Sequence, residues 1–139
     1  MTVITSSISV KTGGNADMID ITRDVSQVVT ESGLSDGIVT IFTPSSTSGI
    51  TTIEYESGCL QDFKRLFDQL APLEQHYAHD ARWGDGNGHS HLRAALLKAS
   101  FTVPFVKSEL TLGTWQQIIF VDFDNHPRQR HLIAQIMGE

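Results

Sequence analysis

The chain has 139 residues, about the length of one domain, and its 40% hydrophobic and 19% charged residues are typical of a globular protein. Ten Lys and Arg residues stand against sixteen Asp and Glu, so the formal net charge is −6. This balance argues against a nucleic-acid partner, because a general nucleic-acid binder needs a basic face to neutralise phosphates. The single cysteine allows neither an internal disulfide nor a cysteine-based zinc cluster.

The sequence also shows no membrane or export signal. No uninterrupted apolar run approaches the roughly 20 residues that a membrane-spanning helix needs. The first residues, Met1 to Ser7, contain neither a basic segment nor an apolar core, so no signal peptide is predicted. We therefore expect one cytoplasmic domain over residues 1–139, without a membrane partner.

The first third of the chain predicts a strand, a helix and two further strands. Val3 to Lys11 is rich in Val, Ile, Ser and Thr and alternates imperfectly, as in a strand. Apolar residues from Ile21 to Val29 then recur at helical spacing. Ile38 to Thr43 and Ile50 to Tyr55 are predicted as strands, joined by the small-residue loop from Ser45 to Gly49.

A second helix is predicted over residues 60–70, where one apolar stripe runs along the helix and Pro72 ends it. The stripe consists of Leu60, Phe63, Leu66, Phe67 and Leu70. The polar stretch 76–91 that follows is interpreted as loop or extended chain, and a short helix is predicted only over residues 92–97.

The last third of the chain predicts consecutive strands with short turns between them. The expected strands cover 101–106, 110–112, 114–123 and 129–137. Strands joined by short turns pair antiparallel, because parallel pairs need long crossovers. The fold class is therefore α+β, a mostly antiparallel sheet or sandwich with two main helices in a single domain.

Histidine placement is the most unusual feature of the sequence. Four of the six histidines lie between positions 76 and 91: His76, His79, His89 and His91. In an extended segment His89 and His91 point the same way, and His79 then completes the three protein ligands typical of catalytic zinc. Glu54 and Asp85 are candidates for additional oxygen ligands. The alternative is that these are surface histidines of a polar loop, since an H-x-H pair alone is a weak signal.

Two loops and one pair of arginines are candidates for binding an anionic ligand. The loop from Trp83 to Gly88 has three glycines, which can bring backbone N–H groups close to a ligand. The serine- and threonine-rich loop 45–49 offers hydroxyl groups. For both loops, spacing and composition alone favour the alternative, a plain connection between elements. Arg128 and Arg130 occupy alternate strand positions and form a suitable phosphate clamp, or alternatively pair with Asp122 or Asp124 at a strand edge.

Several short segments, in this order and spacing, resemble the YjbQ family, small proteins described as secondary thiamine-phosphate-synthase-like. The matching segments are Thr51–Glu56, Tyr77–His79, Asp85–His91, Leu112–Gln117 and Ile136–Glu139. The resemblance implies an α+β fold, a homotrimer with sites near subunit boundaries, and a histidine-rich metal or anion site. It also implies an activity that joins an aminopyrimidine diphosphate to a thiazole phosphate and releases pyrophosphate.

The resemblance leads to specific expectations for the site. Glu54 and His91 are expected to be catalytic, and His79, His89 and His91 to hold a divalent metal, with zinc expected and magnesium an alternative for a diphosphate substrate. A small phosphorylated metabolite is expected as ligand. The substrate-binding candidates are Ser45, Thr47, Asn87, Trp115, Gln116, Arg128 and Arg130. The alternative is a non-catalytic homotrimer that binds a metal or a phosphorylated metabolite.

One departure from the family pattern concerns the first loop. Many relatives carry a histidine directly after the loop proline, in a pattern like P-H-T-T-A, whereas this chain has Ser45 after Pro44. His89 is not a histidine in many of the same relatives. We therefore hypothesise that His89 replaces the missing ligand.

Overall fold

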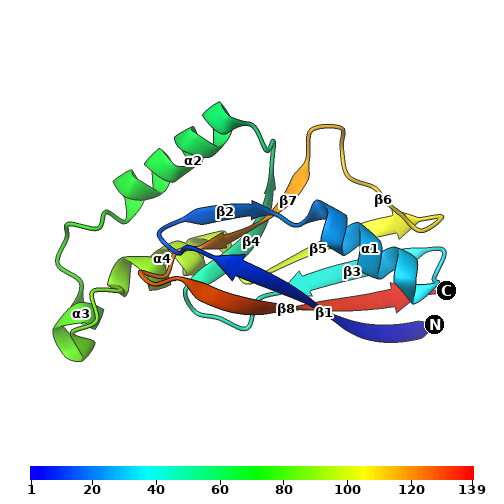
Figure 1. Cartoon of the computed structure of the whole chain (residues 1–139), viewed down its shortest axis with the longest axis horizontal. Helices are drawn as coiled ribbons and strands as arrows, with labels where there is room; N and C mark the ends of the chain where they lie inside the picture. The colour runs from blue at the N-terminus through cyan, green and yellow to red at the C-terminus, as the bar shows by residue number, and fades with distance from the viewer.

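The computed structural model describes residues 1–139 and confirms a single-domain α+β fold with antiparallel sheets (Figure 1). The elements are β1 (Thr2–Thr12), β2 (Asp17–Asp20), α1 (Thr22–Ser32), β3 (Gly37–Phe42), β4 (Ser48–Ile53), α2 (Ser57–Leu70), α3 (Ala78–Trp83), α4 (Gly88–Leu97), β5 (Ser100–Val106), β6 (Glu109–Leu110), β7 (Gln117–Asp122) and β8 (Arg128–Gly138). None of the helices combines the length and apolar composition that crossing a bilayer requires.

The strands form two sheets in which every pair is antiparallel, as the short turns predict. The larger sheet has the order β1-β8-β3-β5-β6, and the smaller has the order β2-β7-β4. Strand β8 therefore lies between β1 and β3, and its residue Gly138 pairs with both Thr2 and Gly37. This pairing places the two termini side by side at one end of the molecule (Figure 1).

Two apolar clusters hold the layers together. The larger cluster joins the inner face of the five-stranded sheet, one face of β7 and β4, and helix α1 through residues such as Ile41, Ile118 and Val29. The smaller cluster joins the opposite face of β7 to helices α2 and α4, with Phe67 between Phe63 and Phe123. The small sheet is thus buried on both faces, which explains the continuous apolar run Ile118–Val121.

Helices α1 and α2 confirm the two main helices predicted from apolar spacing. Helix α1 buries Val25, Val28 and Val29 and ends at Gly33, which adopts the left-handed conformation with φ 71°. Helix α2 begins after Glu56, whose carboxylate accepts hydrogen bonds from the N–H groups of Gly58 and Cys59. These two bonds lower the pKa of Glu56.

Two helices and one strand go beyond the sequence prediction. The polar stretch 76–91 contains α3 and the first turn of α4, because Asp80 accepts a hydrogen bond from the N–H of Gly88 (2.8 Å) and Tyr77 is buried beneath them. Strand β2 is short and only half-buried, so it leaves little periodicity in the sequence. Strand β7 begins at Gln117 rather than near position 114, so Trp115 lies in a loop with 72% of its surface exposed.

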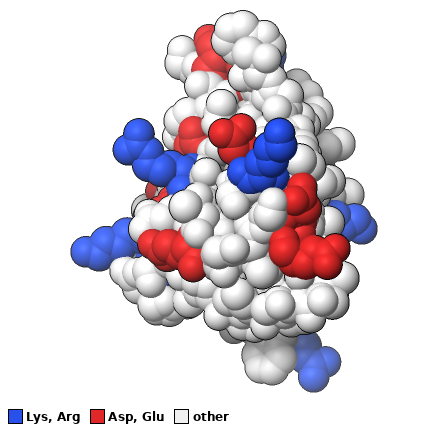
Figure 2. Space-filling model, turned by 90° about the vertical axis from the view of Figure 1, so that its right-hand side faces the viewer, with Lys and Arg blue, Asp and Glu red and all other residues white.

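The fold brings three segments together at the end of the molecule opposite the termini. Helix α3, the start of α4 and the β7–β8 turn meet there (Figure 1). Asn125 of that turn donates hydrogen bonds to Asp85 and Asn87 in the glycine loop. The end that carries the termini shows basic and acidic side chains interspersed, without a basic patch (Figure 2).

Candidate functional site

Helix α4 orients the histidines of the H-x-H pair differently from the extended chain we expected. Successive residues of a helix are about 100° apart around its axis, so residues two apart face nearly opposite sides. His89 is accordingly buried, whereas His91 is half-buried and lies at the surface of the helix. The prediction that both histidines point the same way is therefore wrong, and the reason is the helical start at Gly88.

His79, Asp80 and Asp85 form a compact group of potential metal ligands. One ligand atom from each lies within 4.8 Å of the others. The Nδ1 atom of His79 is 3.3 Å from Oδ1 of Asp85 and 3.6 Å from Oδ1 of Asp80. Although this nitrogen is buried, it has no hydrogen-bond partner. A buried, unpartnered imidazole nitrogen beside two carboxylate oxygens fits a divalent cation, whose ligands these groups are.

His91 connects this group to a cavity. Its ring centroid lies 4.4 Å from that of His79. His91 also lines a cavity of about 330 Å³, together with Ser45, Ser46, Ser48, Lys98 and three alanines. A ligand in this cavity therefore reaches the imidazole of His91, which is itself in contact with the potential metal group.

Three larger surface depressions lack comparable chemistry. One, of about 790 Å³, runs beside α1 and is lined by polar side chains without a histidine. A second, of about 690 Å³, lies between the turn before β2 and helix α2, with Lys64 as its only basic residue. A third, of about 360 Å³, is lined by residues 11–12 and 127–129. None of the three contains the metal-ligand group or a buried unpartnered atom, so the His91 cavity is the better candidate.

His89 is not a member of the metal-ligand group. Its Nε2 atom is 3.1 Å from the hydroxyl of Ser90, which is completely buried. Burial lowers the pKa of His89, and the positive charge of Arg93 lowers it further. The structure thus gives His89 a neutral, buried position and brings Asp80 and Asp85 to His79 instead. The proximity of Asp85 agrees with its candidacy as an oxygen ligand.

The predicted arginine clamp is occupied by carboxylates of the same chain. Arg130 donates from Nε to Asp122 Oδ2 (2.8 Å) and from Nη2 to Asp122 Oδ1 (3.0 Å), and its side chain is only 16% exposed. Asp122 is completely buried and also accepts from the hydroxyl of Thr12. The pairing alternative is therefore the one that the structure shows, and Arg130 is not a free phosphate ligand.

Asp124 ties the first loop to the β7–β8 turn. The hydroxyl of Thr47 donates to Asp124 Oδ2 (3.0 Å) and accepts from Arg130 (3.0 Å), so Thr47 is not free to bind substrate. Arg128 donates to the other oxygen at 3.4 Å. Burial raises the pKa of Asp124, but the hydrogen bonds from Thr47 and Arg128 outweigh it and leave the pKa below its ordinary value.

The lowered pKa of Asp124 predicts a loss of stability in acid. The ionised carboxylate is favoured in the folded state, so its contribution is complete above the ordinary pKa of 3.8 and is lost as the pH falls through the folded value. Asp124→Asn should lower the free energy of unfolding by about 1–3 kcal/mol at pH 7 and by less at pH 3. Urea denaturation at both pH values measures this, with exposed Asp36→Asn as control. An equal loss at both pH values would contradict the ionic role.

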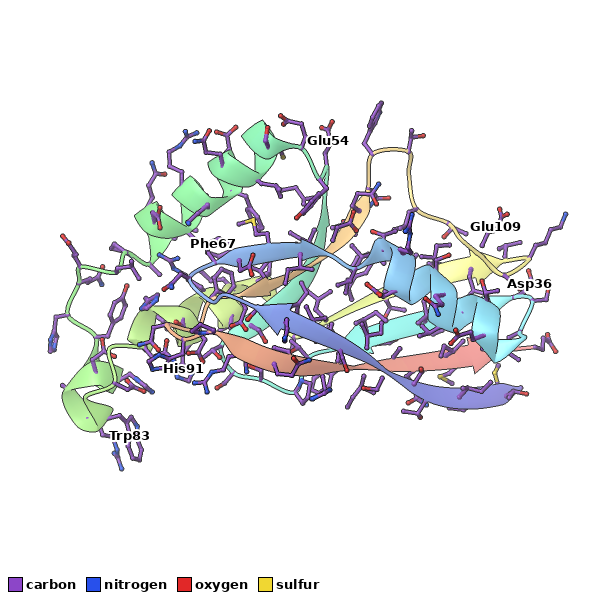
Figure 3. All side chains as sticks on the ribbon, in the orientation of Figure 1. Asp36, Glu54, Phe67, Trp83, His91 and Glu109 are labelled. Carbon is purple, nitrogen blue, oxygen red and sulfur yellow. The ribbon has the colours of Figure 1, made fainter.

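Three other predicted site residues lie elsewhere in this chain. Glu54 follows β4 near the start of α2, well separated from His91 (Figure 3). Trp115 and Gln116 lie in the β6–β7 loop, at a distance from α3 and α4 (Figure 1). Glu54 is exposed, and Gln116 bonds to Gly113 within its own loop. One chain therefore does not bring these three residues to the histidines.

The remaining predicted residues have distinct places. Asn87 is buried and its Oδ1 atom accepts from the N–H of Asn125 (3.3 Å), so it braces the loop. Ser45 lines the cavity. Asp80 and Lys98 were not among the residues predicted for the site. The only indication of Asp80 in the sequence was its position next to His79. Nothing in the sequence pointed to Lys98, because its backbone conformation is seen only in the structure.

Comparison with known proteins identifies the family. The model of the family described as UPF0047 protein YjbQ-like matches residues 6–139. The chain belongs to the YjbQ-like UPF0047 family. The resemblance drawn from the short sequence segments is therefore confirmed over nearly the whole chain.

Several relatives in the YjbQ-like family match over most of their lengths. A UPF0047 protein of Methanothermobacter thermautotrophicus is 39% identical over 139 residues, covering 100% of this chain and 95% of the relative. UPF0047 protein YugU of Bacillus subtilis is 35% identical, covering 95% and 98%. A crystal structure of a YbjQ-like protein of unknown function from Sulfolobus solfataricus is 33% identical, with a TM-score of 0.93 and 99% coverage of both chains.

Proposed function

We propose that this chain binds a divalent metal ion at His79, Asp80 and Asp85, and a phosphorylated small molecule beside it in the His91 cavity. The observation that supports this most directly is the buried Nδ1 atom of His79, which faces two carboxylate oxygens without a hydrogen-bond partner. Zinc suits the mixed imidazole and carboxylate donors, and magnesium is the alternative with a diphosphate ligand.

The reaction proposed on the family resemblance is thiamine-phosphate-synthase-like. The thiazole nitrogen forms a bond to the methylene carbon of the aminopyrimidine, while the bond from that carbon to the diphosphate oxygen breaks and its electron pair leaves with the diphosphate. A bound divalent ion would neutralise charge on the leaving group. Ser45 and Ser46 offer hydroxyl donors to phosphate oxygens, whereas the Ser48 hydroxyl is buried and bonded to Thr43. His91 can hold a proton beside this loop.

Metal content and product release together test this function. Purified wild type is expected to hold close to one metal ion per chain after incubation with zinc, and a His79→Ala/His91→Ala double variant to hold none. Diphosphate release from the aminopyrimidine diphosphate should be saturable, and it should fall to background in His91→Ala and in chelated wild type. His76→Ala is the matched control because His76 is exposed and lies in the same segment.

The outcomes separate the two functions. Metal binding with tight phosphate-ester binding but no diphosphate release would favour the non-catalytic module. Absence of metal from wild type after incubation with both zinc and magnesium would contradict the proposed metal site.

Self-association is the proposed partnership, and the outer face of the five-stranded sheet supports it. Cross-strand rows on this face place Val3, Met137 and Ile38 side by side, and Ile133 beside Phe42. All five are exposed apolar side chains. Among the outward-facing positions of β1, β8, β3 and β5, only Lys11 carries a formal charge. The face thus combines these apolar side chains with uncharged polar ones, and a depletion of charged residues is typical of the core of a subunit interface.

Placing a charge on this face should therefore disrupt assembly. Ile133→Glu is expected to convert a homotrimer to monomer, because the carboxylate would be buried against a second copy without a partner. Light scattering after size-exclusion chromatography measures the mass, with exposed Leu73→Glu on the segment after α2 as control. A wild type that is monomeric at micromolar concentration would contradict the proposed trimer.

A further inference from the structure

Lys98 has a backbone conformation that ordinarily belongs to glycine. Its φ of 84° and ψ of 156° fall in a region populated almost only by residues without a side chain. Four other non-glycine residues also have positive φ, but Asn15, Ala16, Lys107 and Ser108 have φ between 53° and 66°, the ordinary left-handed range of turns.

The fold holds Lys98 in this conformation from both sides. Its N–H donates to the carbonyl of Ala94 (2.9 Å), which ends α4, and its carbonyl accepts from the N–H of Ile50 (3.1 Å) in β4. A Cβ atom on Gly49 would lie 2.8 Å from the Lys98 carbonyl oxygen, so β4 passes too close for the backbone to relax. A glycine at position 98 would make the same two backbone hydrogen bonds with less conformational strain. We therefore expect the lysine side chain to have a role of its own.

Lys98 is exposed and lines the cavity of His91. The other polar residues lining this cavity are Ser45, Ser46, Ser48 and His91, and no carboxylate lines it. The Ser48 hydroxyl is buried and bonded to the Thr43 hydroxyl (2.8 Å), so the donors left for a ligand are the ammonium group of Lys98 and the hydroxyls of Ser45 and Ser46. The positive charge of Lys98 has no carboxylate in the cavity to neutralise it. Strained residues of this kind concentrate where a side chain contributes to function.

We propose that Lys98 completes an oxyanion subsite in this cavity, which takes the phosphate group of a small ligand. This inference rests on the proposed function only in placing a phosphorylated molecule beside His91; it does not depend on the metal. Phosphate suits the subsite better than carboxylate because its three or four oxygens can accept from both hydroxyls as well as from the ammonium.

Binding of inorganic phosphate to metal-free protein tests the subsite. Calorimetric or NMR titration of wild type should show saturable binding. Lys98→Gln, which removes the charge, should weaken binding about tenfold, the loss expected for one charge-assisted hydrogen bond. Lys98→Gly should weaken it equally and raise the melting temperature by roughly 3 °C or more, because the strain is relieved.

Lys107 provides the matched control. It is exposed, has a positive φ and lies in the β5–β6 turn, so Lys107→Gln removes the same charge without touching the cavity. Phosphate affinity should be unchanged in this variant. Unchanged affinity in Lys98→Gln, or equal losses in the two variants, would overturn the proposal. Acetate binding tighter than phosphate would overturn the choice of ligand. Because chelated protein is used throughout, failure of the metal site would leave this result unaffected.

Discussion

Replacing Arg130 by methionine is expected to lower the free energy of unfolding by about 3–5 kcal/mol. The change removes the guanidinium that makes two hydrogen bonds to the completely buried Asp122 and leaves that carboxylate without its cation. The remaining donors to Asp122, the Thr12 hydroxyl and the N–H of Asp124, do not supply a positive charge. Urea denaturation at pH 7 gives the unfolding free energy directly.

Arg128→Met is the matched control for this experiment. Arg128 lies two residues away on the same strand, but its side chain is 45% exposed and makes one contact of 3.4 Å with Asp124. Exposed pairs of this kind contribute about 1 kcal/mol or less. Similar losses in the two variants would show that the buried pair has no special role. The expected difference also means that an Arg130 variant tests stability and not substrate binding.

Asp85→Ala is expected to reduce the affinity for a divalent metal at least about 100-fold, while His89→Gln leaves it unchanged. Removing a residue that only hydrogen-bonds to a metal ligand already lowers the metal affinity roughly 10–100-fold. Asp85 is itself a potential ligand, because its carboxylate lies close enough to His79 to share one ion. His89 is buried against Ser90 and outside the group. Competition with a zinc-responsive chelator measures both affinities on folded protein.

This pair of variants also decides between two ligand sets. Retention of metal in Asp85→Ala together with its loss in His89→Gln would support the histidine set, His79, His89 and His91, over the group in the structure. Asp62→Ala on α2 is the control, because it removes an exposed carboxylate that does not belong to the metal-ligand group. Asp80 is less suitable for this test, because it also accepts the hydrogen bond that starts α4.

Apart from the short, half-buried β2, the strands and the main helices were predictable because their residues carry the hydrophobic period of the element. The apolar spacing of α1 and the alternation in β8 each reflect one buried face. Helix α3 and the first turn of α4 could not be predicted, because they lie in a polar segment. The start of α4 depends on the hydrogen bond from the N–H of Gly88 to the Asp80 carboxylate, which is eight residues earlier in the chain. Polar helices held by tertiary hydrogen bonds leave little hydrophobic pattern in the sequence.

The site was predictable in composition and only partly in geometry. The sequence pointed to His79, His91, Asp85 and the first serine loop, and the structure brings these together at one end of the molecule. The sequence also pointed to Arg130 as a phosphate ligand, because an arginine in a free phosphate clamp and an arginine in a buried ion pair look the same in a sequence. Arg130 forms the buried ion pair because Asp122 is buried beside it, and this burial results from the packing of β7 and β8.

The position of β8 between β1 and β3 has a consequence for how the chain folds. Strand β8 is synthesised after β1 and β3 but lies between them in the larger sheet, so β1 and β3 each keep an unpaired edge until residues 128–138 have emerged. The pairing of Thr2 with Gly138 joins segments that are far apart in the sequence, and contacts of this kind favour slow folding. During synthesis the N-terminal half therefore exposes two open strand edges, the type of surface on which aggregation begins and which chaperones shield.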